Sequence, residues 1–175
     1  VAALARPEGL NDEAILTSVE TIMADVKARG NDAVLSYTRK FDAPDLPSLS
    51  VPLSDCEDAW NTLPSAQQDA LKTAKANVEK FHAAQMPTDI ATETMPGVLC
   101  RRVPRAFRSV GLYVPGGTAP LVSTTIMLAV PAKVAGCERR VMMTPPGPDG
   151  KINQAILAAA FLCDVTDVFA CGGAQ

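Results

Sequence analysis

The chain has few of the residues from which catalytic and metal centres are most often built. Its 175 residues include one His, one Trp and two Tyr. A single His cannot form a zinc site with others of its kind, so a His-rich metal centre is excluded within this chain. The net charge of −3 gives no reason to expect nucleic acid or an anionic membrane as a partner. The composition is otherwise that of a soluble globular protein.

Cysteine is present, but its pattern excludes a disulfide framework. The five cysteines are unevenly spaced and form no CxxC pair; they lie at positions 56, 100, 137, 163 and 171. Such a pattern favours a reducing compartment, which we expect to be the cytoplasm. A helix C-terminus disfavours a thiolate, which counts against Cys137 as a nucleophile. We expect all five thiols to be buried and inert, and the lone His82 to have a structural role near the end of a helix.

Long apolar runs are also absent. No stretch reaches the roughly 18 to 20 residues that a membrane span needs, and the chain does not start with a signal peptide. It opens on Val1 and closes on 171–175 directly after an apolar run, so we expect a truncated polypeptide. The Arg101–Arg102 and Arg139–Arg140 pairs are expected on solvated faces, with a phosphate-bearing ligand as the alternative.

Helical periodicity dominates the first 105 residues. Apolar residues at helical spacing predict a helix over 12–29, capped by Asn11 or Asp12 and ended by Gly30. A second helix follows, in which Ala33, Val34, Tyr37 and Phe41 are expected to face inward. Further on we predict a short strand over 49–53, a helix over 54–60, and a long helix from Ser65 to about Gln85 that buries Leu71, Ala74, Val78 and Phe81.

The pattern changes in the second half. Alternation on either side of Met95-Pro96-Gly97 predicts a β-hairpin over 92–103. Strands over 109–114, 140–144 and 168–170 then alternate with helices over 121–135 and 153–163, which is typical of a parallel sheet covered by helices. The predicted class is therefore α/β, with a helical segment at 1–105 and an incomplete, Rossmann-like half-domain at 106–175. Three strands leave the third with an unpaired edge, which predicts self-association.

The glycine-rich turn over 111–120 is the main candidate for chemistry. It follows a strand and opens a helix, where free backbone amides favour anions. It lacks the GxGxxG spacing and the acidic residue of a dinucleotide fingerprint. A nucleotide site and a merely tight turn both remain open. The ends of the other two strands, at 144–148 and 171–175, would meet this turn in one crevice. The sequence contains no nucleophile–base set and no metal-ligand cluster, so from its residues alone the chain is expected to be a binding fragment.

Several stretches resemble the histidinol dehydrogenase family. The run from Arg108 to Thr124, with Tyr-Val-Pro-Gly-Gly at its centre, is similar to the family's signature, and so are the stretches at 26–35, 77–85, 127–137 and 167–175. The resemblance implies zinc-dependent homodimers, similar in fold to aldehyde dehydrogenases, that oxidise L-histidinol through histidinal to L-histidine and reduce two NAD. By motif position, Tyr113 and Gln175 are expected to contact NAD.

The resemblance also implies what this chain lacks. The family's zinc ligands (a Gln, two His and an Asp), its Glu-His acid/base pair and its substrate-binding residues are expected beyond Gln175. No catalytic or metal-binding residue is therefore assigned here, and we expect the 175-residue chain to be inactive by itself. One alternative is a non-catalytic binding or interaction protein derived from the dehydrogenase. Another, an aldehyde dehydrogenase fragment, lacks that family's sequence around Tyr113 to Pro120.

Overall fold

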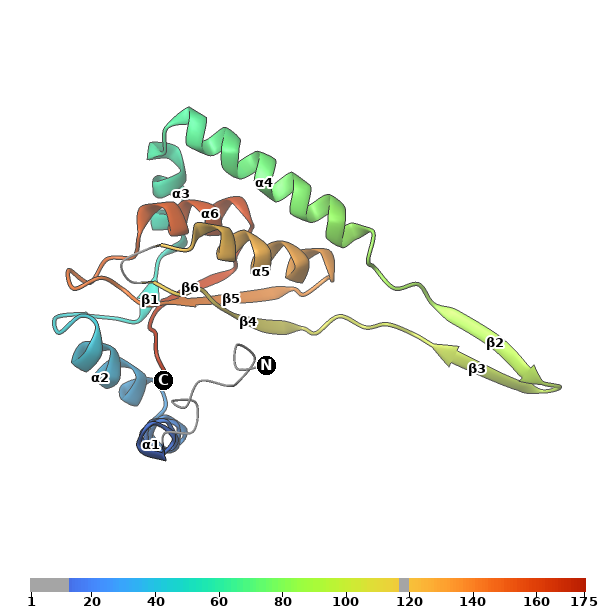
Figure 1. Cartoon of the computed structure of the whole chain (residues 1–175), viewed down its shortest axis with the longest axis horizontal. Coiled ribbons are helices and arrows are strands. Elements are labelled where there is room, and N and C mark those ends of the chain that lie inside the picture. Colours follow the sequence, from blue (N-terminus) through green and yellow to red (C-terminus); the bar gives the residue numbers. More distant parts are fainter. Residues whose placement is uncertain (1–12, 117–119) are drawn as a thin grey trace, which may run out of the picture.

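A computed structural model describes residues 13–116 and 120–175 and contains one mixed sheet, helices on either side of it, and a projecting hairpin (Figure 1). The elements in chain order are α1 (Glu13–Arg29), α2 (Asn31–Phe41), β1 (Ser50–Val51), α3 (Leu53–Thr62), α4 (Ser65–Ala83), β2 (Ile90–Met95), β3 (Val98–Arg102), β4 (Ser109–Tyr113), α5 (Val122–Val134), β5 (Arg139–Thr144), α6 (Gln154–Leu162) and β6 (Asp167–Ala170).

The predicted α/β class and the three parallel strands are confirmed. β4, β5 and β6 are parallel neighbours in a four-stranded sheet of order β1-β6-β5-β4. The prediction that β6 has an unpaired edge is wrong, because β1 pairs with it antiparallel and aligns Ser50 with Phe169. The backbone N–H of Ala170 also donates to the carbonyl of Leu49 at 2.7 Å. A short strand from the first half of the chain therefore closes the edge that local patterns left open.

The hydrophobic core lies between the sheet and helices α5 and α6. Leu112, Met142 and Val168 point from three neighbouring strands toward Ile126 of α5 and Ile156 of α6, and all are buried. Each side chain of this size contributes about 1.5–3 kcal/mol when removed from water. Helices α3 and α4 pack outside α6 and α5, on the same side of the sheet (Figure 1). The first half of the chain thus completes the core of the second.

The helical hairpin α1–α2 differs from the prediction. Gly30 joins the two helices with φ +59°, as its position after the first helix predicts. Helix α1 has no buried residue, and Phe41 is 55% exposed, stacked at 5.9 Å on Tyr37 instead of facing inward. The predicted caps Asn11 and Asp12 lie outside the described residues. The apolar stripe of α1 is real, but no second layer covers it here.

Helix α4 is only partly used by the core. Leu71, Ala74 and Val78 pack against the core as predicted, but Phe81 is 63% exposed. The helix stops at Ala83, and its C-terminal end leads into the segment that runs out to β2 (Figure 1). Across the described residues, no helix is both long and apolar enough to cross a bilayer.

Strands β2 and β3 form the predicted hairpin, which projects away from the rest of the molecule (Figure 1). We call residues 90–102 the arm. Every residue of both strands is exposed, and the pairing is irregular between Glu93 and Met95. The arm therefore adds nothing to the core.

Candidate functional site

The loops that follow the three parallel strands meet at one edge of the sheet, around Pro145. A Cβ on Gly116, after β4, would lie 2.7 Å from Cγ of Pro145. A Cβ on Gly172, after β6, would lie 2.6 Å from Cβ of Pro145. Both distances are far below ordinary carbon–carbon contacts of about 3.5–4.0 Å. These two glycines therefore let three loops close on one proline, which turn chemistry alone does not predict.

The sequence left two interpretations of the glycine-rich turn over 111–120, a nucleotide site and a tight turn. Its residues 117–119 lie outside the part of the chain that the structure describes. The close approach of Gly116 to Pro145 supports the packing interpretation for that one glycine. The nucleotide interpretation depends on backbone amides of the turn and stays a prediction.

A cavity of about 740 Å³ opens beside these loops. It lies between the β5–α6 connection and the end of α2, and its wall includes Gly116, Lys151 and Asn153. Asn153 caps α6, where its side-chain oxygen accepts from the backbone N–H of Ala155 at 2.9 Å. Burial raises the pKa of Asp42, which also lines the cavity. The volume is in the range of small-molecule sites, and one cation and one helix N-terminus face it.

The two expected NAD contacts occupy different positions. Tyr113 is the last residue of β4 and is 45% exposed on the sheet face opposite α5 and α6. Gln175 follows β6, and both polar atoms of its side chain are buried without a hydrogen-bond partner among the described residues. Strand β5 separates β4 from β6, so Tyr113 and Gln175 come from strands that are not adjacent in the sheet. Neither residue lines the 740 Å³ cavity.

Two further polar groups near the site were not predicted. The hydroxyls of Thr125 on α5 and Thr144 at the end of β5 are buried and, in the described part of the chain, have no hydrogen-bond partner. An unpaired buried hydroxyl costs roughly 1–3 kcal/mol. Thr144 begins the strand-end segment 144–148, and that position was the only feature of the sequence that could have pointed to its hydroxyl. No feature pointed to Thr125, because a Thr within a helix has no distinctive pattern.

Four of the five cysteines are buried as expected, and the fifth is not. Burial raises the pKa of the Cys56 thiol to about 11 and that of Cys163 to about 11, so neither is a thiolate at neutral pH. Cys137 and Cys171 are also buried. The expectation for Cys100 is wrong: it is exposed on β3 because the arm has no covering layer.

His82 lies in the last turn of α4 with its ring edge-on to Phe81 at 5.5 Å between centroids. A basic side chain suits that end of a helix. Within residues 13–116 and 120–175, no three His, Cys, Asp or Glu residues are grouped as a metal ion would need.

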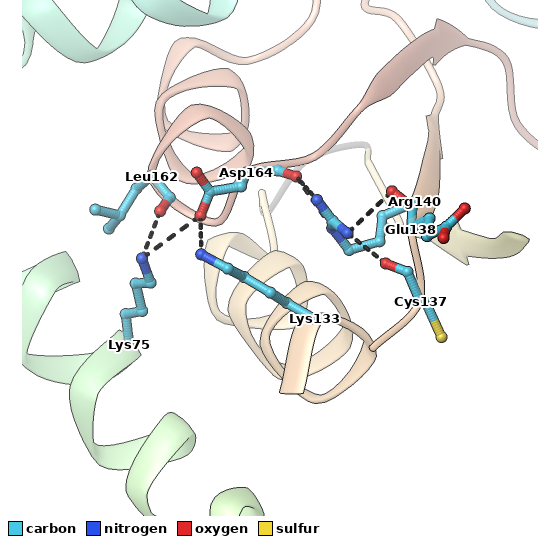
Figure 2. Close-up of polar contacts among 7 residues, drawn as sticks. All are labelled: Lys75, Lys133, Cys137, Glu138, Arg140, Leu162 and Asp164. Atoms are coloured by element: carbon cyan, nitrogen blue, oxygen red, sulfur yellow. Dashed lines mark hydrogen bonds and ion pairs between the residues drawn. The ribbon is translucent and has the colours of Figure 1, made fainter. Parts of the chain in front are cut away.

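A polar cluster around Asp164 joins side chains and backbone carbonyls and is structural (Figure 2). Lys133 of α5 contacts the Asp164 carboxylate at 2.6 Å, and Lys75 of α4 contacts it at 3.8 Å. Lys75 also donates to the carbonyl of Leu162, in the last turn of α6, at 2.9 Å. Asp164 has φ +56°, in the left-handed region that commonly ends a helix. The cluster ties the C-terminal ends of α5 and α6 to the middle of α4.

Arg139 is exposed, as expected, and Arg140 is partly buried; both guanidinium groups make contacts within the fold. Arg139 pairs with Asp167 of the neighbouring strand at 2.8 Å. The guanidinium of Arg140 donates to backbone carbonyls at the ends of α5 and α6, those of Cys137, Glu138 and Asp164 (Figure 2). The phosphate alternative finds no support at this pair, because Nε and Nη2 of Arg139 donate to Asp167 and the guanidinium of Arg140 donates to three backbone carbonyls.

Comparison with known proteins places the whole arrangement in a family. The family model described as histidinol dehydrogenase matches residues 5–175. Histidinol dehydrogenase from Idiomarina loihiensis is 45% identical over 98% of this chain and 39% of its own length. The one from Bacteroides thetaiotaomicron is 43% identical over 99% of this chain and 41% of its own length.

The fold agrees with the sequence match. The crystal structure of histidinol dehydrogenase from Elizabethkingia anophelis superposes with a TM-score of 0.88 and 36% identity, over 98% of this chain and 39% of that one. The chain therefore spans about two fifths of the length of the relatives it matches. Since the family model covers nearly every residue and the fold superposes over the same span, the chain belongs to the histidinol dehydrogenase family.

Proposed function

We propose that this chain is part of an NAD-dependent enzyme that oxidises L-histidinol through histidinal to L-histidine, at the end of histidine biosynthesis. The observation that carries the proposal is the family match over residues 5–175. The chain spans about two fifths of its relatives, so the activity is proposed for the longer protein. Residues 106–175 are proposed as a partial NAD-binding half-domain.

The strand-end crevice suits NAD in three respects. Sheet ligands gather at the carboxyl ends of parallel strands, where β4, β5 and β6 end together. Tyr113 offers an exposed aromatic ring at one strand end, and Gln175 holds a side-chain amide that lacks an internal partner. When bound, NAD accepts the hydride. The chain's own residues bind and orient it, with Tyr113 packing against the dinucleotide and Gln175 donating to it or accepting from it.

Zinc does not fit the residues described. No group of three or more candidate ligands occurs among them, and the only His of the chain lies in α4 beside an exposed Phe. We derive no step through zinc from these residues. The metal ligands, the acid/base pair and the histidinol contacts are proposed for the rest of the longer protein, and the 175-residue chain is proposed to be inactive by itself.

Two further properties are proposed from the family. The longer enzyme is a homodimer, and its compartment is the cytoplasm; the five unpaired cysteines support a reducing compartment.

The test separates binding from turnover. The 175-residue chain should produce no NADH from L-histidinol, whereas the longer protein should. NAD titrated into the longer protein should bind several-fold more weakly after Tyr113→Ala or Gln175→Ala, because a lost contact of about 1 kcal/mol is roughly a fivefold loss of affinity. Tyr37→Ala, which removes the other tyrosine from α2, is the matched control. NADH production by the short chain would refute its proposed inactivity. No NAD binding by either protein would favour the non-catalytic binding protein.

A further inference from the structure

Asp42, directly after α2, lines the 740 Å³ cavity and is held in place by buried neighbours. Its backbone N–H donates to the carbonyl of Thr38 at 2.9 Å, and the N–H of Ala43 donates to the same carbonyl at 3.0 Å. Thr38 and Ala43 are both buried. The core therefore fixes the backbone at this position, so that Asp42 is presented to the cavity from a rigid support.

The two carboxylates in the wall of this cavity differ in what they contact. That of Asp149 is engaged in its own turn, where Oδ1 accepts from the backbone N–H of Lys151 at 3.1 Å. That of Asp42 is partly buried, and within residues 13–116 and 120–175 no hydrogen bond or ion pair offsets the burial that raises its pKa. Such groups cost stability and gather at binding sites. Asp42 is therefore the carboxylate available to a hydrogen-bond donor in the cavity.

The cavity lies where a dinucleotide at the strand ends can extend. Its wall includes Gly116, three residues after Tyr113, and Pro145, which follows β5. In dinucleotide-binding sheets, an acidic residue beyond the glycine-rich turn accepts from a ribose hydroxyl of NAD. Here the next acidic residue along the chain, Glu138, immediately precedes β5 and so lies at the opposite edge of the sheet. An acid for the ribose must therefore come from another segment.

We propose that Asp42 selects NAD over NADP by accepting hydrogen bonds from the ribose hydroxyls of the adenosine half. In NADP the 2′-hydroxyl carries a phosphate, which replaces a donor with negative charge facing the carboxylate. Like charges in a partly water-excluded cavity repel more strongly than in bulk water. The inference rests on the NAD dependence proposed above and adds to it the residue that decides between the two dinucleotides.

The experiment titrates NADH and NADPH into the longer protein and follows the fluorescence of the bound dinucleotide. Asp42→Asn keeps the shape of the side chain, and Asn suits the end of a helix, so this variant should fold. Asp149→Asn is the matched control, because it removes the same charge from the same cavity wall. We expect Asp42→Asn to weaken NADH binding about fivefold and to strengthen NADPH binding about tenfold, so that the ratio of the affinities changes about fiftyfold. Asp149→Asn should change that ratio by less than about fivefold.

Every other outcome overturns the inference. Equal losses of both affinities in Asp42→Asn would show a residue that supports the pocket without distinguishing the dinucleotides. Unchanged affinities would show that Asp42 does not contact the dinucleotide, as when another part of the longer protein fills the cavity. An equal change in Asp149→Asn would assign the selectivity to the net charge of the cavity. In all three cases, NADH binding by the parent would leave the proposed function standing, whereas a parent that binds neither dinucleotide would refute both.

Discussion

Replacing Gly172 with alanine tests the packing of the three strand-end loops around Pro145. The new Cβ would lie 2.6 Å from Cβ of Pro145, about 1 Å inside ordinary contact distance. The neighbouring atom belongs to a proline ring next to a buried strand, so it cannot swing away. Overpacking of this kind costs about 1–3 kcal/mol. Gly172 does not have a positive φ, so alanine introduces no backbone strain and gains about 0.4–1 kcal/mol from the unfolded chain.

The expected net result is a loss of about 1–2 kcal/mol in the free energy of unfolding, measured by urea denaturation. Trp60 is a suitable probe because its ring packs 6.4 Å from Phe161 of α6. Gly111→Ala is the matched control: its Cβ would meet only the flexible end of Met143, at 3.3 Å, and should cost little. In a Pro145→Gly background, which removes the clashing atom, Gly172→Ala should cost almost nothing. The same cost in both backgrounds would refute the packing argument.

Three other perturbations have defined outcomes. Lys75→Met removes the donor to the carbonyl of Leu162 and the contact with Asp164, and should lower the free energy of unfolding by about 1 kcal/mol. Lys80→Met, at an exposed position of the same helix, is the control and should change it little. Equal effects of the two variants would contradict the role of the cluster. In the native protein a maleimide should label only Cys100 quickly, because the other four thiols are buried and burial raises the pKa of Cys56 to about 11. After unfolding, all five cysteines should be labelled. Rapid labelling of more than one thiol in the native protein would show that the core opens. Arg139 lowers the pKa of Asp167, so their ion pair stabilises the fold at pH values above the unfolded pKa of Asp167, and this contribution disappears as the pH falls through the lowered pKa. Asp167→Asn should reduce the loss of unfolding free energy on acidification by at most about 1 kcal/mol. An unchanged dependence of unfolding free energy on pH would contradict this.

Local patterns predicted most of the elements, for a physical reason. Helical periodicity and the alternation of strands with helices depend on residues a few positions apart, so the helices and the parallel strands could be placed to within a few residues. The strand-end crevice followed from the rule that parallel strands share one carboxyl edge. The assignment of Tyr113 and Gln175 to NAD came from motif position and remains a prediction.

Contacts between distant segments were beyond those patterns. Nothing near Ser50 shows that it will pair with Phe169, because strand pairing depends on what lies beside each edge after folding. The periodicity that placed Phe41 and Phe81 on apolar faces could not say whether a second layer would cover them. Cys100 fits a strand equally well whether that strand lies in a core or in an exposed arm.

The sequence by itself determined the α/β class, the order of the elements and the family resemblance, because these depend on residue type and spacing along the chain. Only the tertiary structure decided that β1 completes the sheet, that Gly116 and Gly172 close on Pro145, and that both strands of the arm are exposed throughout. Those features depend on which atoms meet in space, and spacing along a chain does not specify such meetings.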